Sequence, residues 1–233
     1  MLFFYVRHGE PIYDPDSLTP LGQEQAAALA TRLARYGLDE IYSSTSNRAR
    51  QTAQPTAKAL AKEVTLLDFA NEGHAWRQLS FEQDGHRMWL FQSGRMRRIF
   101  SSPEITSLGA DWYRHPDFTQ YREGMERIAR EGDAFLASLG YEHIVGSGSY
   151  RVREANERRV ALFAHHGFGM AFLSHLLDIP YPAFATRFDM CHSGLTVIRF
   201  ANEGEYAFPK VLSFTDTGHL YREDVPVRYD EQY

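Results

Sequence analysis

Cysteine and long apolar runs are both scarce in this sequence of 233 residues. The single cysteine, Cys191, cannot form an intramolecular disulfide, which excludes a disulfide scaffold and weakens any cysteine-based metal site. The apolar stretch at the N-terminus covers residues 1–6 and ends at Arg7, whereas a transmembrane helix needs about 20 apolar residues and a signal-peptide core at least about 7. We therefore expect a cytoplasmic protein with no membrane partner.

Several common catalytic and metal-binding motifs are absent as well. The sequence contains no His-Glu-x-x-His, no pair of histidines four residues apart and no Cys-x-x-Cys, so we expect neither a metal nor a cofactor despite the ten histidines. The absence of Gly-x-x-x-x-Gly-Lys excludes a P-loop enzyme. The absence of Gly-x-Ser-x-Gly excludes the nucleophile elbow of serine hydrolases.

Lysine is also scarce, because 22 of the 25 lysine and arginine residues are arginines. The codon usage of a GC-rich genome is a sufficient cause for most of this excess, so a role is assigned to an arginine only from its position. The net charge of −5 argues against nucleic acid as a partner. The length and a hydrophobic fraction of 43% predict a single domain over residues 1–233, with room for an inserted subdomain.

The first third of the chain alternates between strand and helix patterns. The strands are expected over residues 2–6, 40–43 and 64–67, and the helices over residues 20–36 and 46–62. Thr19 followed by Pro20 is typical of a helix start, and Pro55 lies inside the second helix. This order predicts an α/β fold, a three-layer α/β/α sandwich with a mostly parallel central sheet.

Residues 74–118 interrupt the alternation with tryptophans, prolines and a run of arginines, and predict a cap inserted beside the sheet. The tryptophans are expected to pack the cap rather than to bind a cofactor. A helix is expected over residues 118–139 and a turn over residues 146–149. A second buried strand (160–164), a helix (168–177) and a hairpin (195–200 and 206–214) complete the prediction.

The two most apolar strands both end in a histidine-containing turn followed by glycine. Arg7-His8-Gly9 ends the first strand, and His165-His166-Gly167 ends the second. In open α/β sheets, ligands bind at the carboxyl ends of the strands, so neighbouring strands would bring these side chains into one pocket. Arginine pairs with phosphate oxygens, and a neutral imidazole can attack phosphorus, so the pattern favours a phosphate site.

Three blocks in residues 1–62 resemble the histidine phosphatase superfamily, the phosphoglycerate mutase-like branch with an Arg-His-Gly motif. They are Arg7-His8-Gly9-Glu10, then Leu18-Thr19-Pro20-Leu21-Gly22, then Ser43-Ser44-Thr45-Ser46-Asn47-Arg48-Ala49-Arg50. The strand and His turn at residues 160–167 supply a fourth match, and residues 74–158 supply none. The resemblance implies a phosphoglycerate mutase-like domain that works through a phosphohistidine.

The resemblance also implies roles for individual residues. His8 matches the histidine that is phosphorylated, and Arg7 and Arg48 match two phosphate-binding arginines, whereas Arg50 is read as a solvent-exposed helix residue. The second family histidine is followed by two glycines, but this chain has a histidine doublet. Keeping Gly167 as the second glycine assigns the role to His165, with His166 as a neighbour that contacts substrate; keeping His-Gly together assigns it to His166.

The resemblance also implies a proton donor, a glutamate placed after the third strand and shortly before a glycine and a tryptophan. Glu72 fits this position, although its spacing to Trp76 departs from the family pattern, and Asp68 and Glu82 stay open as alternatives. A second departure is Asp14, where many members have a phosphate-contacting Asn; no role is assigned to it.

The resemblance implies a histidine acid phosphatase-type phosphoric monoester hydrolase that acts without metal on a small phosphorylated metabolite. One alternative is a cofactor-dependent phosphoglycerate mutase, although the chain lacks the Pro-Pro-containing insert that is usual in the mutases. The other alternative is a non-catalytic phospholigand-binding protein. The substrate and the oligomeric state are not predicted.

Overall fold

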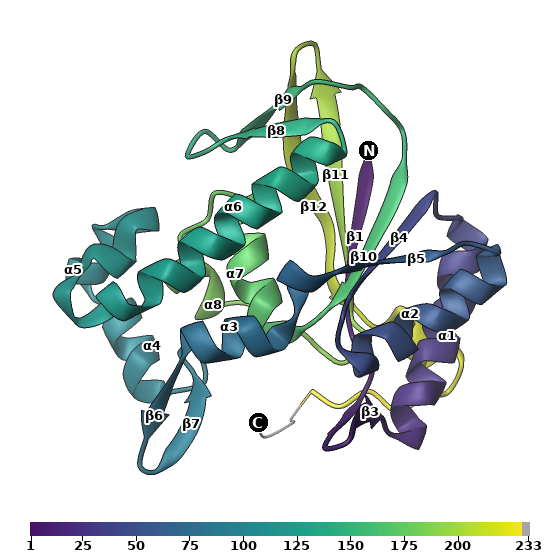
Figure 1. The fold of residues 1–233 in the computed structure, drawn as a ribbon, viewed down its shortest axis with the longest axis horizontal. Coiled ribbons are helices and arrows are strands. Elements are labelled where there is room, and N and C mark those ends of the chain that lie inside the picture. Colours follow the sequence, from purple (N-terminus) through teal and green to yellow (C-terminus); the bar gives the residue numbers. More distant parts are fainter. Residues whose placement is uncertain (230–233) are drawn as a thin grey trace.

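A central eight-stranded sheet organises the chain, whose computed structural model describes residues 1–229 (Figure 1). The last four residues of the predicted domain, 230–233, lie outside the described residues. The strand order is β5 (Val64–Leu67), β4 (Glu40–Ser44), β10 (Arg159–Ala164), β1 (Leu2–Arg7), β11 (Leu195–Glu203), β12 (Tyr206–Asp216), β9 (Ser149–Val152) and β8 (Tyr141–Ile144). The strands from β5 to β1 are parallel to one another, and the others extend the sheet by antiparallel pairing.

Helices cover both faces of the sheet, which confirms the predicted three-layer α/β/α class. Alternate residues of β1 point to opposite faces: Phe4 packs with α1 (Pro20–Tyr36) and α2 (Asn47–Leu60), whereas Phe3 packs with α6 (Arg122–Ser138) and α7 (His166–Leu176). Strand β1 is buried on both sides because it lies in the middle of the sheet. Its carboxyl end lies beside that of its parallel neighbour β10, where Arg7 is paired with Ala164.

Residues 74–118, for which the sequence predicts a cap, contribute no strand to the eight-stranded sheet. They continue α3 (Glu72–Leu79) into a hairpin of β6 (Ser80–Gln83) and β7 (His86–Trp89), followed by α4 (Gly94–Phe100) and α5 (Pro103–Thr106). Figure 1 shows this region at the left of the molecule, on the side of α3 away from the central sheet. Trp112 is fully buried there among aromatic rings, as expected of a packing residue.

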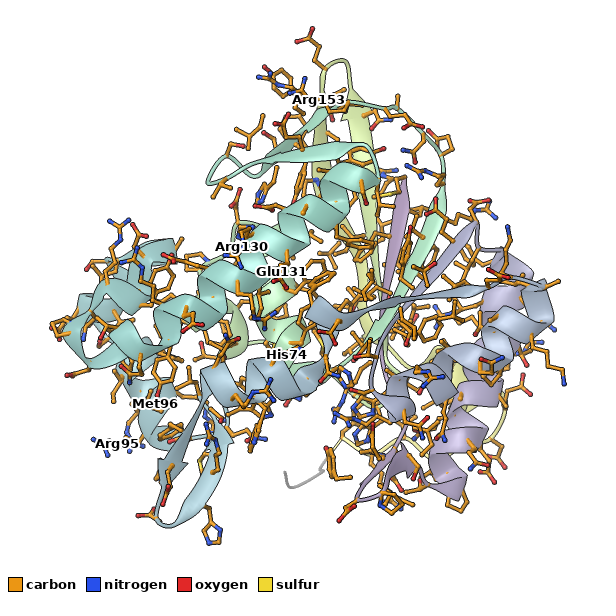
Figure 2. The ribbon with its side chains drawn as sticks, in the orientation of Figure 1. His74, Arg95, Met96, Arg130, Glu131 and Arg153 are labelled. Atoms are coloured by element: carbon orange, nitrogen blue, oxygen red, sulfur yellow. The ribbon has the colours of Figure 1, made fainter. Side chains whose placement is uncertain are left out.

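The basic run within this region lies largely on the surface. On α4, Arg95, Arg97 and Arg98 are exposed, whereas Met96 is buried. Figure 2 shows Arg95 at the outer side of the helix, away from the sheet.

Most predicted elements are present, with shifts at their ends. The prediction of a helix start at Thr19 is confirmed, because its hydroxyl accepts the N–H of Gly22 at 3.0 Å. The helix expected over residues 118–139 begins later, at Arg122, because residues 116–121 form a separate 3-10 turn that starts at Pro116. The second helix ends at Leu60 rather than at residue 62, because the next residue adopts a left-handed conformation with φ of 52°.

Three pairs of short strands were not predicted. They are β2 (Pro11–Tyr13) with β3 (Asp16–Leu18), β6 with β7, and β8 with β9. A turn was predicted over residues 146–149; the connection from β8 to β9 covers residues 145–148, Ser149 already belongs to β9, and Gly146 has a positive φ of 81° that suits this position. Among residues 1–229, no helix combines the length and apolar character needed to cross a membrane.

Candidate active site

A cavity of about 1420 Å³ lies at the carboxyl end of β1. Most of its walls come from three parts of the chain: the turn after β1, the start of α2, and the segment formed by α3 and the β6–β7 hairpin; His166, His192 and Arg228 complete them. Arg7, His8 and Arg48 line it on the sheet side, and Trp76 and Trp89 line it on the other. The cavity therefore joins the predicted phosphate-binding residues to the predicted cap.

The turn after β1 leaves no room for a side chain at Gly9. A Cβ atom on Gly9 would lie 2.6 Å from the carbonyl oxygen of Gly22, and one on Gly22 would lie 2.2 Å from that of Glu10. The turn and the first residues of α1 therefore contact each other through their backbones. This contact holds the His8 backbone at the edge of the sheet.

The His8 ring is held in one orientation by two contacts. Its Nδ1 lies 2.7 Å from the carbonyl oxygen of Gly9, so Nδ1 carries the hydrogen and donates it. The lone pair is then on Nε2, which accepts a hydrogen bond of 3.3 Å from Nε of Arg48. Burial, followed by the charges of His165, Arg7 and Arg48, lowers the pKa of His8 well below its usual value. His8 is therefore neutral at physiological pH, and Nε2 is its nucleophilic atom.

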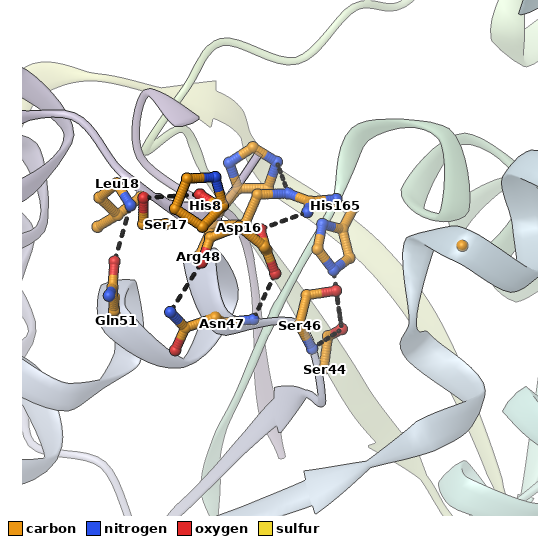
Figure 3. A network of polar contacts seen from close by, with 12 residues as sticks. His8, Asp16, Ser17, Leu18, Ser44, Ser46, Asn47, Arg48, Gln51 and His165 are labelled. Atoms are coloured by element: carbon orange, nitrogen blue, oxygen red, sulfur yellow. Dashed lines mark hydrogen bonds and ion pairs between the residues drawn. The ribbon is translucent and has the colours of Figure 1, made fainter. Parts of the chain in front are cut away.

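Arg48 is fixed at the first turn of α2, next to His8. Its Nη1 forms an ion pair of 2.7 Å with Asp16, and its guanidinium lies 5.4 Å from the ring centroid of Tyr13. The other oxygen of Asp16 accepts the N–H of Asn47 at 2.7 Å, so Asp16 also caps the start of α2 (Figure 3). Arg50, two residues further on, is exposed, as predicted.

Arg7 reaches the same cavity from the end of β1 and is only 4% exposed. Its Nη1 donates to the carbonyl oxygen of Met190, and its Nη2 donates to Nε2 of His192 at 2.6 Å. The ring of His192 lies 5.6 Å from that of His8. His192 was not predicted from the sequence, because its loop reaches the site only through antiparallel pairing of β11 with β1, where Leu195 lies opposite Val6.

The two histidines of the doublet occupy different environments. His165 is fully buried, its ring lies 5.1 Å from the His8 ring, and its Nε2 lies 2.8 Å from the hydroxyl of Ser44 (Figure 3). Its Nδ1 is buried and has no hydrogen-bond partner among residues 1–229. Burial, followed by the charges of Arg48 and Arg7, lowers the pKa of His165 well below its usual value.

His166 lines the cavity directly. Its Nε2 lies 3.1 Å from a carboxylate oxygen of Asp189, and its ring lies 4.8 Å from that of Phe91. Burial lowers the pKa of His166 to about 4. The structure thus brings both histidines next to the site: His165 lies beside His8 but is not among the residues that line the cavity, whereas His166 lies in the cavity wall.

Glu72 lies at the cavity and also caps α7. One of its carboxylate oxygens accepts the N–H of Gly167 and the other accepts that of Phe168, both at 2.9 Å. Because the Glu72 carboxylate accepts these two N–H groups, α7 begins at His166, two residues before residue 168, where the sequence predicts its start. Burial raises the pKa of Glu72 above its usual value. The two backbone hydrogen bonds and the charges of Arg48 and Arg7 lower it, but their effect is smaller than that of burial.

The other carboxylates that the sequence analysis considered lie away from the cavity. Asp68 forms an exposed ion pair with His74 at 3.0 Å, and contact with His74 lowers the pKa of its carboxyl. Glu82 is exposed on β6, and Asp14 is exposed in the turn between β2 and β3. None of these three is among the described residues that line the cavity.

The cap side of the cavity is aromatic and partly basic. The rings of Trp76 and Trp89 meet edge to face at 4.9 Å, and Arg87 and His86 lie on the same wall. Trp89 packs directly on the start of α7, because a Cβ atom on Gly167 would lie 2.3 Å from its ring. The cap wall and the start of α7 are therefore in direct contact.

Comparison with known families confirms the resemblance noted in the sequence. Residues 3–108 match the model of the histidine phosphatase superfamily (branch 1). No curated protein matches the chain.

Solved structures share the fold over nearly the whole chain. A phosphoserine phosphatase from Entamoeba histolytica, crystallised with phosphoserine, has 19% identity and a TM-score of 0.61, covering 94% of this chain and 98% of its own. The alpha-ribazole phosphatase from Shigella flexneri has 17% identity and a TM-score of 0.59, with 93% and 97% covered. A mycobacterial glucosyl-3-phosphoglycerate phosphatase has 16% identity and a TM-score of 0.56, with 92% and 98% covered.

Proposed function

We propose that this chain, whose residues 3–108 match the histidine phosphatase superfamily, is a metal-independent phosphomonoesterase acting through a phosphohistidine on a small phosphorylated metabolite. The observation that carries the proposal is the state of His8. Its Nδ1–H is held by a backbone carbonyl, its Nε2 carries the lone pair and accepts a 3.3 Å hydrogen bond from Arg48, and His8 lines a cavity together with Arg7 and Arg48. A neutral imidazole beside guanidinium groups is suited to attack the phosphorus of an ester that those groups have bound.

The phosphate oxygens would be held by three groups that surround His8. Arg7 and Arg48 supply guanidinium hydrogens, which neutralise the charge that builds up on the oxygens in the transition state. His165 supplies its buried Nδ1, which has no partner among residues 1–229 and lies on a ring next to His8. We assign the second histidine role to His165 for this reason. His166, in the cavity wall, is assigned to the leaving-group side.

Glu72 is assigned the proton transfers. In the first step, Nε2 of His8 forms a bond to phosphorus, the bond from phosphorus to the ester oxygen breaks, and Glu72 protonates that oxygen. In the second step, a water molecule gives its proton to Glu72 and attacks phosphorus, which releases inorganic phosphate and restores His8. The raised pKa of Glu72 favours the protonated form that the first step requires.

The cavity is large enough to hold a small metabolite beyond its phosphate group. Three structural neighbours are phosphatases named for phosphoserine, glucosyl-3-phosphoglycerate and alpha-ribazole. In this chain the part of the ester beyond the phosphate would lie between the sheet-side arginines and the rings of Trp76 and Trp89. We propose that this wall selects the substrate.

The test is turnover of p-nitrophenyl phosphate by wild type and by His8→Ala. The proposal predicts loss of turnover in His8→Ala and retention in His219→Ala, a control that removes another buried histidine outside the cavity. EDTA is expected to leave turnover unchanged, and strong inhibition would contradict metal independence. With 3-phosphoglycerate, release of phosphate supports the phosphatase, whereas conversion to 2-phosphoglycerate without release would favour a mutase.

A further inference from the structure

Outside the candidate active site, three side chains with metal-binding atoms converge from three separate elements. Asp133 lies on α6, His143 on β8 and His175 in the last turn of α7. Within residues 1–229, this is the only group of three or more such side chains whose donor atoms all lie within 4.8 Å of one another. None of the three lines the candidate active site. The sequence analysis missed the group, because its members are far apart in the chain.

The donor atoms are spaced much as the ligands of a small ion are. Nδ1 of His143 and Nε2 of His175 are 3.3 Å apart, and Oδ1 of Asp133 lies 2.9 Å and 2.8 Å from them. A tetrahedral zinc ion, with bonds of about 2.0–2.1 Å, holds neighbouring ligand atoms roughly 3.3 Å apart. The two nitrogens already have this separation, and Asp133 would need to move by about half an ångström.

The second nitrogen of His143 is held in the way typical of a metal-bound imidazole. Its Nε2 lies 3.2 Å from Oδ2 of Asp178, whose carboxylate also accepts the N–H groups of Gly146 and Gly148 at 2.9 and 2.7 Å. A carboxylate that accepts the outer N–H of a ligating histidine fixes its orientation and raises its affinity for the metal. The His143 ring is also stacked on Tyr150, with centroids 4.4 Å apart.

We propose that Asp133, His143 and His175 form a binding site for one divalent transition-metal ion, such as Zn²⁺, that links α6, β8 and the end of α7. Two imidazole nitrogens and one carboxylate oxygen are the donors that such ions accept, whereas Mg²⁺ and Ca²⁺ prefer oxygen ligands alone. The His143 side chain is 1% exposed, but Asp133 is 29% exposed, so water can complete the coordination from the Asp133 side. The site is separate from the phosphate reaction, and its role is to stabilise the fold.

The charges around the group suit a cation. The carboxylates of Asp133 and Asp178 lie 2.9 and 3.2 Å from the two nitrogens of His143. An ion bound by His143 and His175 would therefore have one carboxylate as a ligand and a second behind the ligating ring.

The experiment is calorimetric titration of EDTA-treated, dialysed protein with Zn²⁺. Wild type should bind one equivalent, and the double variant His143→Ala/His175→Ala should lose this binding. His115→Ala serves as the matched control and should bind as wild type does, because His115 also lies 2.9 Å from a carboxylate, that of Glu104, but in the cap. Asp178→Asn should weaken binding by about 10–100-fold, the effect expected of a residue behind the ligand.

A second measurement needs no variant, which matters if the double variant does not fold. Co²⁺ added to wild-type protein should develop the intense visible absorption of a four-coordinate site, and Zn²⁺ should raise the melting temperature. Turnover of p-nitrophenyl phosphate should not change with one equivalent of Zn²⁺. Equal Zn²⁺ binding by wild type and the double variant, or a Co²⁺ spectrum like that of the free ion, would overturn the proposal. Inhibition of turnover by one equivalent of Zn²⁺ in both wild type and the double variant would also overturn the proposal, because it would place the ion at the active-site histidines.

Discussion

Replacing Glu72 by glutamine separates its proposed chemical role from its structural one. In the structure its two carboxylate oxygens accept the N–H groups of Gly167 and Phe168. The amide of Glu72→Gln keeps the size of the side chain and one acceptor oxygen, but it cannot release a proton. The variant therefore loses general-acid catalysis while most of the cap on α7 is retained.

The expected magnitude depends on the leaving group. A positioned general acid contributes about 10²–10⁴-fold, so kcat/KM for an alkyl phosphate should fall by that factor in Glu72→Gln, which is roughly 3–5 kcal/mol of barrier. The p-nitrophenolate ion leaves without needing a proton, so kcat/KM for p-nitrophenyl phosphate, which reports phosphoryl transfer to His8 and not the later hydrolysis of phosphohistidine, should fall far less. One N–H at the start of α7 loses its acceptor, which should lower the free energy of unfolding by about 1–3 kcal/mol.

The assay is the ratio of kcat/KM values for an alkyl phosphate and p-nitrophenyl phosphate, measured in wild type, Glu72→Gln and Asp68→Asn. Asp68→Asn removes the rival carboxylate, which is exposed and away from the cavity, and should leave the ratio unchanged. Because the pKa of Glu72 is raised, wild-type kcat/KM for the alkyl ester should decline above that raised pKa, and this decline should vanish in Glu72→Gln. Equal losses for both substrates would refute the general-acid role. Glu72 would then have only its structural role as the hydrogen-bond acceptor at the start of α7.

Three further predictions concern the phosphate site and its surroundings. Gly167→Ala should destabilise the fold by about 1–3 kcal/mol in chemical denaturation, because the added methyl group meets the Trp89 ring; an unchanged midpoint would contradict this packing. Arg48→Lys should lower kcat/KM by about 10²-fold, since lysine can contact Asp16 or the phosphate but not bridge both; wild-type kinetics would contradict the assignment. The pKa of His166 is lowered to about 4 in the folded protein, so the unfolded chain binds its proton first as the pH falls below 6.5. The free energy of unfolding should therefore drop between pH 6.5 and 4, by about 3 kcal/mol from this residue, and this part should be absent in His166→Asn.

The layers of the fold could be predicted because the strands beside the site are strongly apolar. The strand at residues 2–6 and the strand at residues 160–164 have side chains buried on both faces, and each ends at a polar turn. Such strands belong in the middle of a sheet, which places His8 and His165 together. The β8–β9 hairpin could not be predicted in this way, because its strands are short and carry polar residues such as Glu142 and Arg151.

The parts of the site that the sequence did not predict depend on contacts between distant segments. His192 reaches Arg7 through a loop whose position is set by antiparallel pairing of β11, and no local pattern marks that pairing. Asp16 both caps α2 and pairs with Arg48, although it lies in a short hairpin that propensity alone does not indicate. Glu72 was found only because the family pattern pointed to it, since its cap on α7 joins residues 95 positions apart.

The central claim is that phosphate is transferred to Nε2 of His8. The most direct measurement is rapid mixing of wild-type protein with ³²P-labelled substrate, a quench in alkali that preserves phosphohistidine, and mass spectrometry of the digested chain. The account predicts an acid-labile phosphate on the peptide that contains His8, appearing before inorganic phosphate and absent in His8→Ala. Phosphate release in a single step with no labelled protein, or a label on His165 or His166, would contradict it.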